Sequence, residues 1–219
     1  MTRSTTRLTT ITKIAAKGEL GEVLIQLMMV CNDLTLCNHA LGAWKSEGDG
    51  KLQCRKTGAQ MYFVRLQIAH MFEAMEIVKR IRESHELMEL VTGADSRTRD
   101  SFTRTANFIG SADYEKMLRI RNNMTFHYGD GIIRKALKKP SSGLKGMNLV
   151  VTLSDDLSQW FFAPSDRIID QIVVREIFAV PQDADVRKEV DEIADRLLSY
   201  IENFGDFAGN FIWKYATGG

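Results

Sequence analysis

The N-terminal third of the chain carries apolar side chains at intervals of three or four positions. One stripe runs from Glu19 to Trp44, and a broader one runs from Leu52 to Arg82. A repeat near 3.6 residues is typical of helices that bury one face. The polar segment 45–51 contains two glycines and no apolar residue, so we predict two long antiparallel helices joined by a short turn. The predicted solvated face of the second helix consists of charged residues: Arg65, Glu73, Glu76, Lys79 and Arg80.

Shorter helical segments follow, separated by polar or glycine-containing breaks. Ser, Asp and Asn side chains at such breaks favour the position that caps a helix N-terminus. The predicted segments are, in order, 85–91, a helix capped by Asp95 or Ser96 that ends near Ile109, a helix over Tyr114–Tyr128 capped by Ser111 or Asp113, and one or two turns over Ile132–Lys139.

A different pattern begins near residue 148. Residues 148–153 and 159–163 are short β-branched or aromatic runs around a polar turn, which is typical of a β-hairpin. Helical periodicity returns at Pro164, breaks at Pro181 and resumes in a final long helix over about Ala184–Tyr215. The sequence therefore predicts a mainly α single domain over residues 1–219: a bundle of about six or seven helices, with a small hairpin insert at 148–163 and C-terminal helices at 164–215.

Composition narrows the class of protein. The chain has 219 residues, of which 44% are hydrophobic, 26% are charged and only 3 are proline, as in ordinary globular proteins. Because 29 Lys and Arg residues stand against 28 Asp and Glu residues, no global charge excess indicates a nucleic-acid or membrane partner. The three cysteines form no CxxC pair and are expected to be reduced structural thiols. No apolar run is long enough for a signal peptide or a membrane span, so we expect a cytoplasmic protein with no membrane partner.

Motifs for metals and nucleotide cofactors are absent from the sequence. It contains no HExxH, no paired Cys/His spacing, no GxxxxGK[ST] and no strand-linked GxGxxG, so we expect no metal site and no cofactor. Three scattered histidines are interpreted as surface or packing residues: His39, His70 and His85. Four aromatic residues near the C-terminus are assigned to the core, with a partner surface as the alternative; they are Phe204, Phe207, Phe211 and Trp213.

One segment carries residues suited to chemistry on RNA. Arg121 and Asn122 are followed, after four further residues, by His127. The 2′-hydroxyl of RNA is an internal nucleophile, so a histidine can move a proton near neutral pH while a guanidinium stabilises charge on the phosphate. Neither step needs a metal ion. The structural alternative is that His127 caps or packs at the helix end and that Arg121 belongs to an ion pair.

This Arg-Asn-(four residues)-His arrangement resembles the signature of the HEPN superfamily, the higher eukaryotes and prokaryotes nucleotide-binding domains. The resemblance covers Glu19–Lys139 and includes Ile68–Lys79, which looks like the long core helix of such bundles. It implies a helical homodimer that cleaves RNA without a metal ion, in prokaryotic defence or as a toxin with a possible antitoxin protein. It also implies catalytic roles for Arg121, Asn122 and His127, in which Asn122 orients a side chain or contacts the phosphate. Non-catalytic members keep the fold and bind nucleotide, RNA or a protein partner, which is the alternative function.

The spacing within this motif raises a geometric question. Residues six apart on a regular helix differ by about 240° in direction and about 9 Å along the axis, so Arg121 and His127 do not share a face. Either the helix loosens toward Gly129, or Arg121 of one protomer completes a site with His127 of another. A helix C-terminus favours a protonated histidine, which suits an acid better than a base, so the assignment of acid and base stays open.

Local charge gives independent support for an RNA partner. Between Asp113 and Met147, eight cations stand against three acidic residues. A row of cations can bind along a phosphate backbone. The alternative is that these cations belong to a solvated helix end, where the helix dipole favours positive charge. Segment 183–206 is instead acidic and is expected to avoid nucleic acid. The residues predicted to bind RNA are Arg119, Arg134, Lys135, Lys138 and Lys139.

Overall fold

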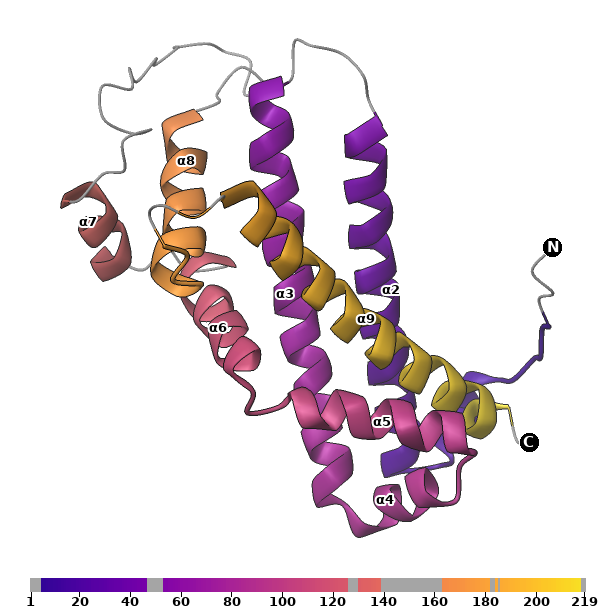
Figure 1. Cartoon of the computed structure of the whole chain (residues 1–219). Helices are drawn as coiled ribbons and strands as arrows, with labels where there is room; N and C mark the ends of the chain where they lie inside the picture. Colours follow the sequence, from indigo (N-terminus) through magenta and orange to yellow (C-terminus); the bar gives the residue numbers. More distant parts are fainter. Residues whose placement is uncertain are drawn as a thin grey trace. The chain divides into compact units, whose positions relative to one another are not determined.

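The computed structural model describes residues 5–46, 53–125, 130–138, 163–181, 184 and 186–217, most of them in helices (Figure 1). No strand occurs among these residues, which confirms the prediction of a mainly α protein. Two π-helical segments, η2 and η4, each continue an α-helix. The elements are α1 (Ile11–Ala15), α2 (Glu19–Ser46), α3 (Gln53–Glu83), α4 (His85–Thr92), α5 (Ser96–Phe108), α6 (Ala112–Ile120), η2 (Arg121–Thr125), α7 (Asp130–Lys138), α8 (Ala163–Gln171), η4 (Ile172–Ile177) and α9 (Val186–Ala216).

Most of the predicted helices are present with bounds close to those expected. The two long helices are α2 and α3, and α4, α5 and α9 also match their predicted segments. The hairpin predicted at 148–163 lies outside the described residues except for Ala163, which begins α8 instead of ending a strand. Pro164 favours a helix start here, because the N–H that proline lacks has no intrahelical partner in the first turn.

The chain divides into two compact units. The first consists of Met1–Thr35, His70–Ser111 and Arg196–Gly219, and the second of Leu36–Ala69 and Ala112–Asp195. Helices α2 and α3 each contribute residues to both units. The expectation of a single domain over residues 1–219 stays a prediction.

The core of the first unit is aromatic and comes largely from α9. Phe204, Phe207 and Phe211 are fully buried, which confirms that they pack in the core. The ring of Phe207 meets Phe102 of α5 edge-on, with centroids 4.9 Å apart. Trp213 differs, since 37% of it is exposed and the guanidinium of Arg7 lies 4.4 Å from its ring centroid. The aromatic run thus serves packing, and only its last member reaches the surface.

Helix α2 is the one described helix that is long and apolar enough to cross a membrane, over Glu19–Ala43. No such segment is expected from the length of the apolar runs in the sequence. Val23, Leu24 and Leu27 on this helix are fully buried in the first unit. Packing within the unit therefore accounts for part of the apolar composition. The cytoplasmic location stays a prediction.

The junction between α1 and α2 depends on two glycines. Gly18 has a φ of +58°, a left-handed conformation that residues with a side chain rarely adopt. Gly21, in the first turn of α2, lies so close to α1 that a Cβ atom there would clash with the carbonyl oxygen of Ile14. The chain therefore reverses at Gly18, and α1 packs directly on the backbone of α2.

Helix α5 begins with the cap that the sequence predicts. Thr98 donates its backbone N–H to Oδ1 of Asp95 over 3.0 Å and its hydroxyl to Oδ2 over 2.8 Å. These bonds stabilise the ionised carboxylate, so they hold the pKa of Asp95 below its usual value. The cap is therefore sensitive to acid.

We expect Asp95→Asn to change the pH dependence of stability. Because the pKa of Asp95 is lowered in the folded state, its ionised form contributes stability above the unfolded pKa of about 3.9. That contribution is lost as the pH falls through the lower folded value. The difference in unfolding free energy between wild type and Asp95→Asn, measured by urea titration, should shrink below about pH 4. A difference that stays constant down to about pH 3 would contradict this role.

Candidate functional site

The helix that carries the predicted motif changes from an α-helix to a π-helix at the first residue of the motif. Helix α6 ends at Ile120, and its continuation η2, Arg121–Thr125, is a π-helix. A π turn closes hydrogen bonds over five residues instead of four, so the helix is locally wider. The sequence allowed for a helix that loosens along the motif. The π turn is such a loosening, and it lies in the described part of the motif, Arg121–Thr125. Arg121 and Asn122 are the first two residues of this turn, and His127 lies outside the described residues.

The side chains of Arg121 and Asn122 are joined by a hydrogen bond. Nη1 of Arg121 donates to Oδ1 of Asn122 over 3.1 Å. Next to them, Nδ2 of Asn123 donates to the carbonyl oxygen of Arg119 over 2.8 Å. Asn122 is exposed and Arg121 is half-buried, so the guanidinium is oriented close to the surface. A guanidinium at the surface is a suitable group to approach a phosphate oxygen.

A buried arginine supports the π turn from α3. Arg65 is only 7% exposed, and its Nη1 donates to the carbonyl oxygen of Met124 over 2.5 Å. Met124 is itself fully buried in η2. A π turn interrupts the regular pairing of backbone carbonyls, and a buried carbonyl needs a partner. Arg65 supplies that partner, so it helps to hold the turn that carries Arg121 and Asn122.

The placement of Arg65 on a solvated face of α3 is therefore wrong. Its hydrogen-bond acceptor lies 59 residues further along the chain, which periodicity within α3 cannot reveal. The available signal is local: Arg65 and Gln67 interrupt an otherwise apolar run, Phe63–Ala69. Both are buried, and Nε2 of Gln67 donates to Oδ1 of Asn38 over 2.8 Å. Polar residues inside an apolar run thus indicate buried hydrogen-bonding roles.

Helix α8 places an acidic group in the same environment. Burial raises the pKa of the Asp166 carboxyl, and the positive charge of Arg65 acts in the opposite direction. Arg65 is thus close enough to interact with a carboxylate on α8 while it holds the backbone of η2. Arg65 of α3 thus donates to the backbone of η2, and its charge also acts on a carboxylate of α8.

Two of the residues predicted to bind RNA are engaged by Glu176 of η4. Nη2 of Arg119 donates to the carbonyl oxygen of Glu176 over 3.3 Å, and Nζ of Lys135 pairs with its carboxylate. These contacts connect α6 and α7 to η4 within the second unit. Arg119 and Lys135 therefore have a structural function in addition to any phosphate contact.

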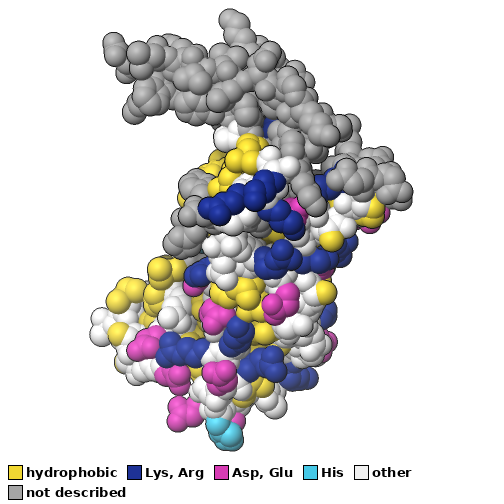
Figure 2. All heavy atoms as spheres, turned by 90° about the vertical axis from the view of Figure 1, so that its left-hand side faces the viewer, with side chains coloured by type: hydrophobic (Ala, Val, Ile, Leu, Met, Phe, Trp, Pro, Cys, Tyr) yellow, Lys and Arg dark blue, Asp and Glu magenta, His cyan; other side chains and the backbone are white. Residues whose placement is uncertain are grey.

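Arg134 and Lys138 differ from that pair. Both are exposed on α7, one helical turn apart, and neither forms an ion pair with any side chain in the described ranges. A surface hollow of about 430 Å³ lies against them, with Ile133 and Leu137 as its other lining residues. Figure 2, seen from the side on which α7 lies in Figure 1, shows dark-blue Lys and Arg side chains over the upper part of this face. Lys139 lies outside the described residues.

Metal-ligating side chains do not gather in the part of the chain that the structure describes. Among these residues, no group of three or more His, Cys, Asp or Glu side chains is placed to hold a metal ion. Cys37 is buried and Cys31 is half-buried, and burial raises the pKa of the Cys31 thiol. A raised pKa keeps a thiol protonated and poorly nucleophilic, as expected of a structural cysteine.

Comparison with known proteins adds no relative to this description. No protein-family model, curated protein or solved structure matches the chain. The HEPN resemblance therefore depends on the spacing of Arg121, Asn122 and His127 in the sequence, and the function it implies is a proposal.

Proposed function

We propose that this protein is an HEPN-like endoribonuclease that cleaves RNA without a metal ion. The observation that carries the proposal is the π turn at Arg121–Thr125. It orients the Arg121 guanidinium through Asn122 and interrupts the regular helix between Arg121 and the position of His127. The exposed cations Arg134 and Lys138 belong to the same unit, and in this proposal they bind the phosphate backbone of the RNA.

The chemistry proposed for this site is an internal transfer at phosphorus. The 2′-oxygen forms a bond to the adjacent phosphorus while the bond to the 5′-oxygen breaks, which gives a 2′,3′-cyclic phosphate and a 5′-hydroxyl. One proton leaves the 2′-hydroxyl and one is delivered to the departing 5′-oxygen; His127 carries one of these transfers and water carries the other. Arg121 stabilises the charge that develops on the phosphate oxygens, and Asn122 holds the guanidinium in place. None of these roles needs a metal ion.

The active form in this proposal is a homodimer. Pairing of the two motif helices around a twofold axis allows Arg121 of one protomer to act with His127 of the other, which overcomes the angular separation within one helix. The interface needs to bury about 1,000 Å² or more to be stable. If the biological setting is a toxin–antitoxin pair, the further partner would be an antitoxin protein.

A non-catalytic helical module is the second candidate. It is favoured by the hollow beside α7, where 59% of the apolar residue Leu137 is exposed next to Arg134 and Lys138. Such a mixed surface can bind RNA or a protein partner without any chemistry. Incubation of RNA with the purified chain in a chelator separates the two, since only the ribonuclease produces cyclic phosphate ends.

Reversal of the two exposed charges on α7 is expected to weaken RNA binding. In Arg134→Glu/Lys138→Glu, loss of two phosphate contacts should reduce the slope of log affinity against log salt concentration by about 1.4 for single-stranded RNA. Fluorescence anisotropy at several salt concentrations measures this slope. Lys135 is left unchanged because its replacement by glutamate would oppose Glu176 and disturb the fold.

A matched control uses two lysines with the same spacing in the first unit. Lys13→Glu/Lys17→Glu makes the same change in charge at exposed or half-buried positions four residues apart. The control should leave the salt slope close to that of the wild type. If both double variants lower the slope equally, RNA responds to net charge alone and α7 is not the binding surface.

A further inference from the structure

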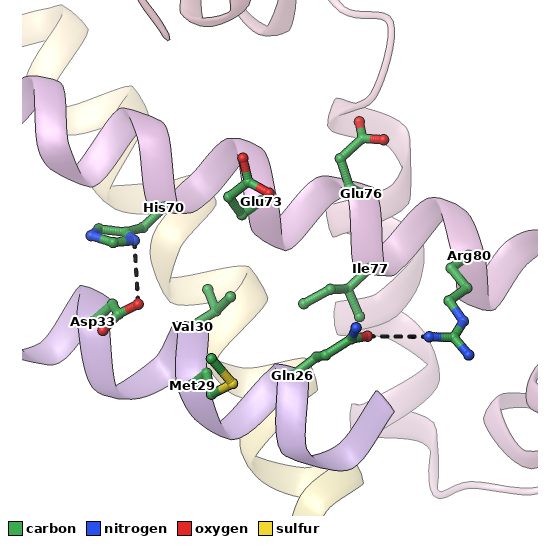
Figure 3. A pocket seen from close by; sticks show the side chains of 9 residues that line it. All are labelled: Gln26, Met29, Val30, Asp33, His70, Glu73, Glu76, Ile77 and Arg80. Carbon is green, nitrogen blue, oxygen red and sulfur yellow. Dashed lines mark hydrogen bonds and ion pairs between the residues drawn. The ribbon is translucent and has the colours of Figure 1, made fainter. Parts of the chain in front are cut away.

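A groove of about 420 Å³ lies between α2 and α3 within the first unit (Figure 3). Its floor is apolar: Val30 and Ile77 are largely buried between the helices, and Met29 at the edge is 59% exposed. Glu73 and Glu76 stand on α3 along one side. His70 and Asp33 face each other across one end, with Nδ1 of His70 3.4 Å from Oδ2 of Asp33. His70, assigned from the sequence to packing or the surface, is thus a boundary residue of the groove.

The other end of the groove contains a cation whose charge is neutralised. Nε of Arg80 donates to Glu19 over 3.2 Å and Nη2 donates to Glu22 over 2.9 Å. These two carboxylates, Glu22 foremost, raise the pKa of Arg80 above its ordinary value. Five carboxylates therefore surround the groove or bind its cation, against the two cations Arg80 and Lys79. The groove is an acidic surface with an apolar floor.

We infer that this groove docks an amphipathic helix of a partner protein, with apolar residues on the floor and Lys or Arg residues facing the carboxylates, one of which, Glu76, pairs with Lys79 over 2.6 Å. The inference does not depend on the proposed cleavage of RNA. Charge complementarity selects a cationic partner, and the same negative charge disfavours a nucleic acid. Residues on one face of a helix, three or four positions apart, match an apolar floor with an acidic edge on α3.

The dimensions of the groove fit a helix better than a small molecule. Between His70 and Arg80, α3 advances about 15 Å, which corresponds to nearly three turns of a partner helix. The groove is open along its length, whereas a site for a small ligand encloses most of its surface. Met29 is exposed and conformationally adaptable, as is common on surfaces that accept helices.

A peptide titration with the full chain tests this inference. The probe is a peptide of about 14 residues, built from leucine and lysine with helical spacing, and the reference is its leucine–glutamate counterpart. We expect the lysine peptide to bind with a Kd of about 10 μM or lower and the glutamate peptide not to bind. Glu73→Lys/Glu76→Lys should weaken binding of the lysine peptide about tenfold or more. Met29→Gln should weaken it too, at a position exposed enough to leave the fold intact.

The control places the same charge reversals on another acidic surface. Asp195→Lys/Glu202→Lys changes two exposed carboxylates of α9 that lie outside the groove. If this control weakens peptide binding as much as the groove variant does, attraction is general and the inference fails. It also fails if spermine displaces the peptide at equal concentration, which would indicate a site for small cations. Self-association of the wild type that is lost in Glu73→Lys/Glu76→Lys would instead assign the groove to a second copy of this chain.

Discussion

Replacement of His127 or Arg121 by alanine will lower the rate of RNA cleavage by about a hundredfold or more, the usual effect of removing a group that transfers a proton. The expected loss for Arg121→Ala comes from the charge on the phosphate, which no other side chain of the π turn can stabilise in the same way. Rates with a fluorescent oligonucleotide, measured under single-turnover conditions, report the chemical step. Arg121 is half-buried at the surface of η2, so its loss should leave the circular dichroism spectrum unchanged.

Neighbouring residues provide the control for this prediction. Asn123→Ala removes a side chain from the same turn, whose hydrogen bond goes to the Arg119 carbonyl and not to the guanidinium. It should reduce cleavage much less than Asn122→Ala, which removes the Oδ1 acceptor of Arg121. Equal losses in both variants would mean that the turn matters only as a folded element.

Mixing two inactive variants tests whether the site is shared between protomers. An Arg121→Ala protomer and a His127→Ala protomer can form a heterodimer with one intact composite site. Cleavage should then return in the mixture. A mixture that forms heterodimers and remains as inactive as either variant, while the wild type is active, contradicts the shared site.

Replacement of Arg65 by methionine will destabilise the protein by about 2–3 kcal/mol. The substitution removes the donor to the Met124 carbonyl and the cation that acts on Asp166, and leaves both groups partly or fully buried. Methionine keeps much of the side-chain volume, so the loss reports hydrogen bonding more than packing. Urea unfolding measures the difference, and hydrogen exchange at Arg121–Thr125 should show faster opening of the π turn.

An exposed arginine on the same helix is the matched control. Arg82→Met makes an identical change near the end of α3, at an exposed position, and should alter stability by about 0.5 kcal/mol or less. Arg65→Lys keeps the charge and a donor, so its loss of stability should fall between those of Arg65→Met and Arg82→Met. Stability of Arg65→Met equal to that of Arg82→Met would contradict the role of Arg65 in holding η2.

The elements that periodicity and capping determine were predictable from sequence. The stripe from Glu19 to Trp44 corresponds to α2, and the Asp95 cap begins α5, because both signals act over one or two helical turns. The assignment of Phe204, Phe207 and Phe211 to the core is likewise confirmed, since all three are fully buried in α9. Local physical rules were sufficient in these cases.

Features that depend on distant partners were not predictable in the same way. The change from α- to π-helix at Arg121 accompanies a hydrogen bond from Arg65, which lies on another helix. The number of basic residues around α6 and α7 did not distinguish Lys135 from Arg134. Lys135 pairs with Glu176, whereas Arg134 has no ion pair among the described side chains. Charge composition identifies a surface, but only three-dimensional contacts separate its structural cations from those left for a ligand.

Analysis of RNA ends after incubation with the wild-type chain in excess EDTA tests the central claim most directly. The proposal predicts cleavage that persists in the chelator and yields 2′,3′-cyclic phosphate and 5′-hydroxyl ends, with no such products from His127→Ala. Intact RNA, or cleavage that appears only after a divalent metal is added, would contradict a metal-independent ribonuclease centred on Arg121, Asn122 and His127.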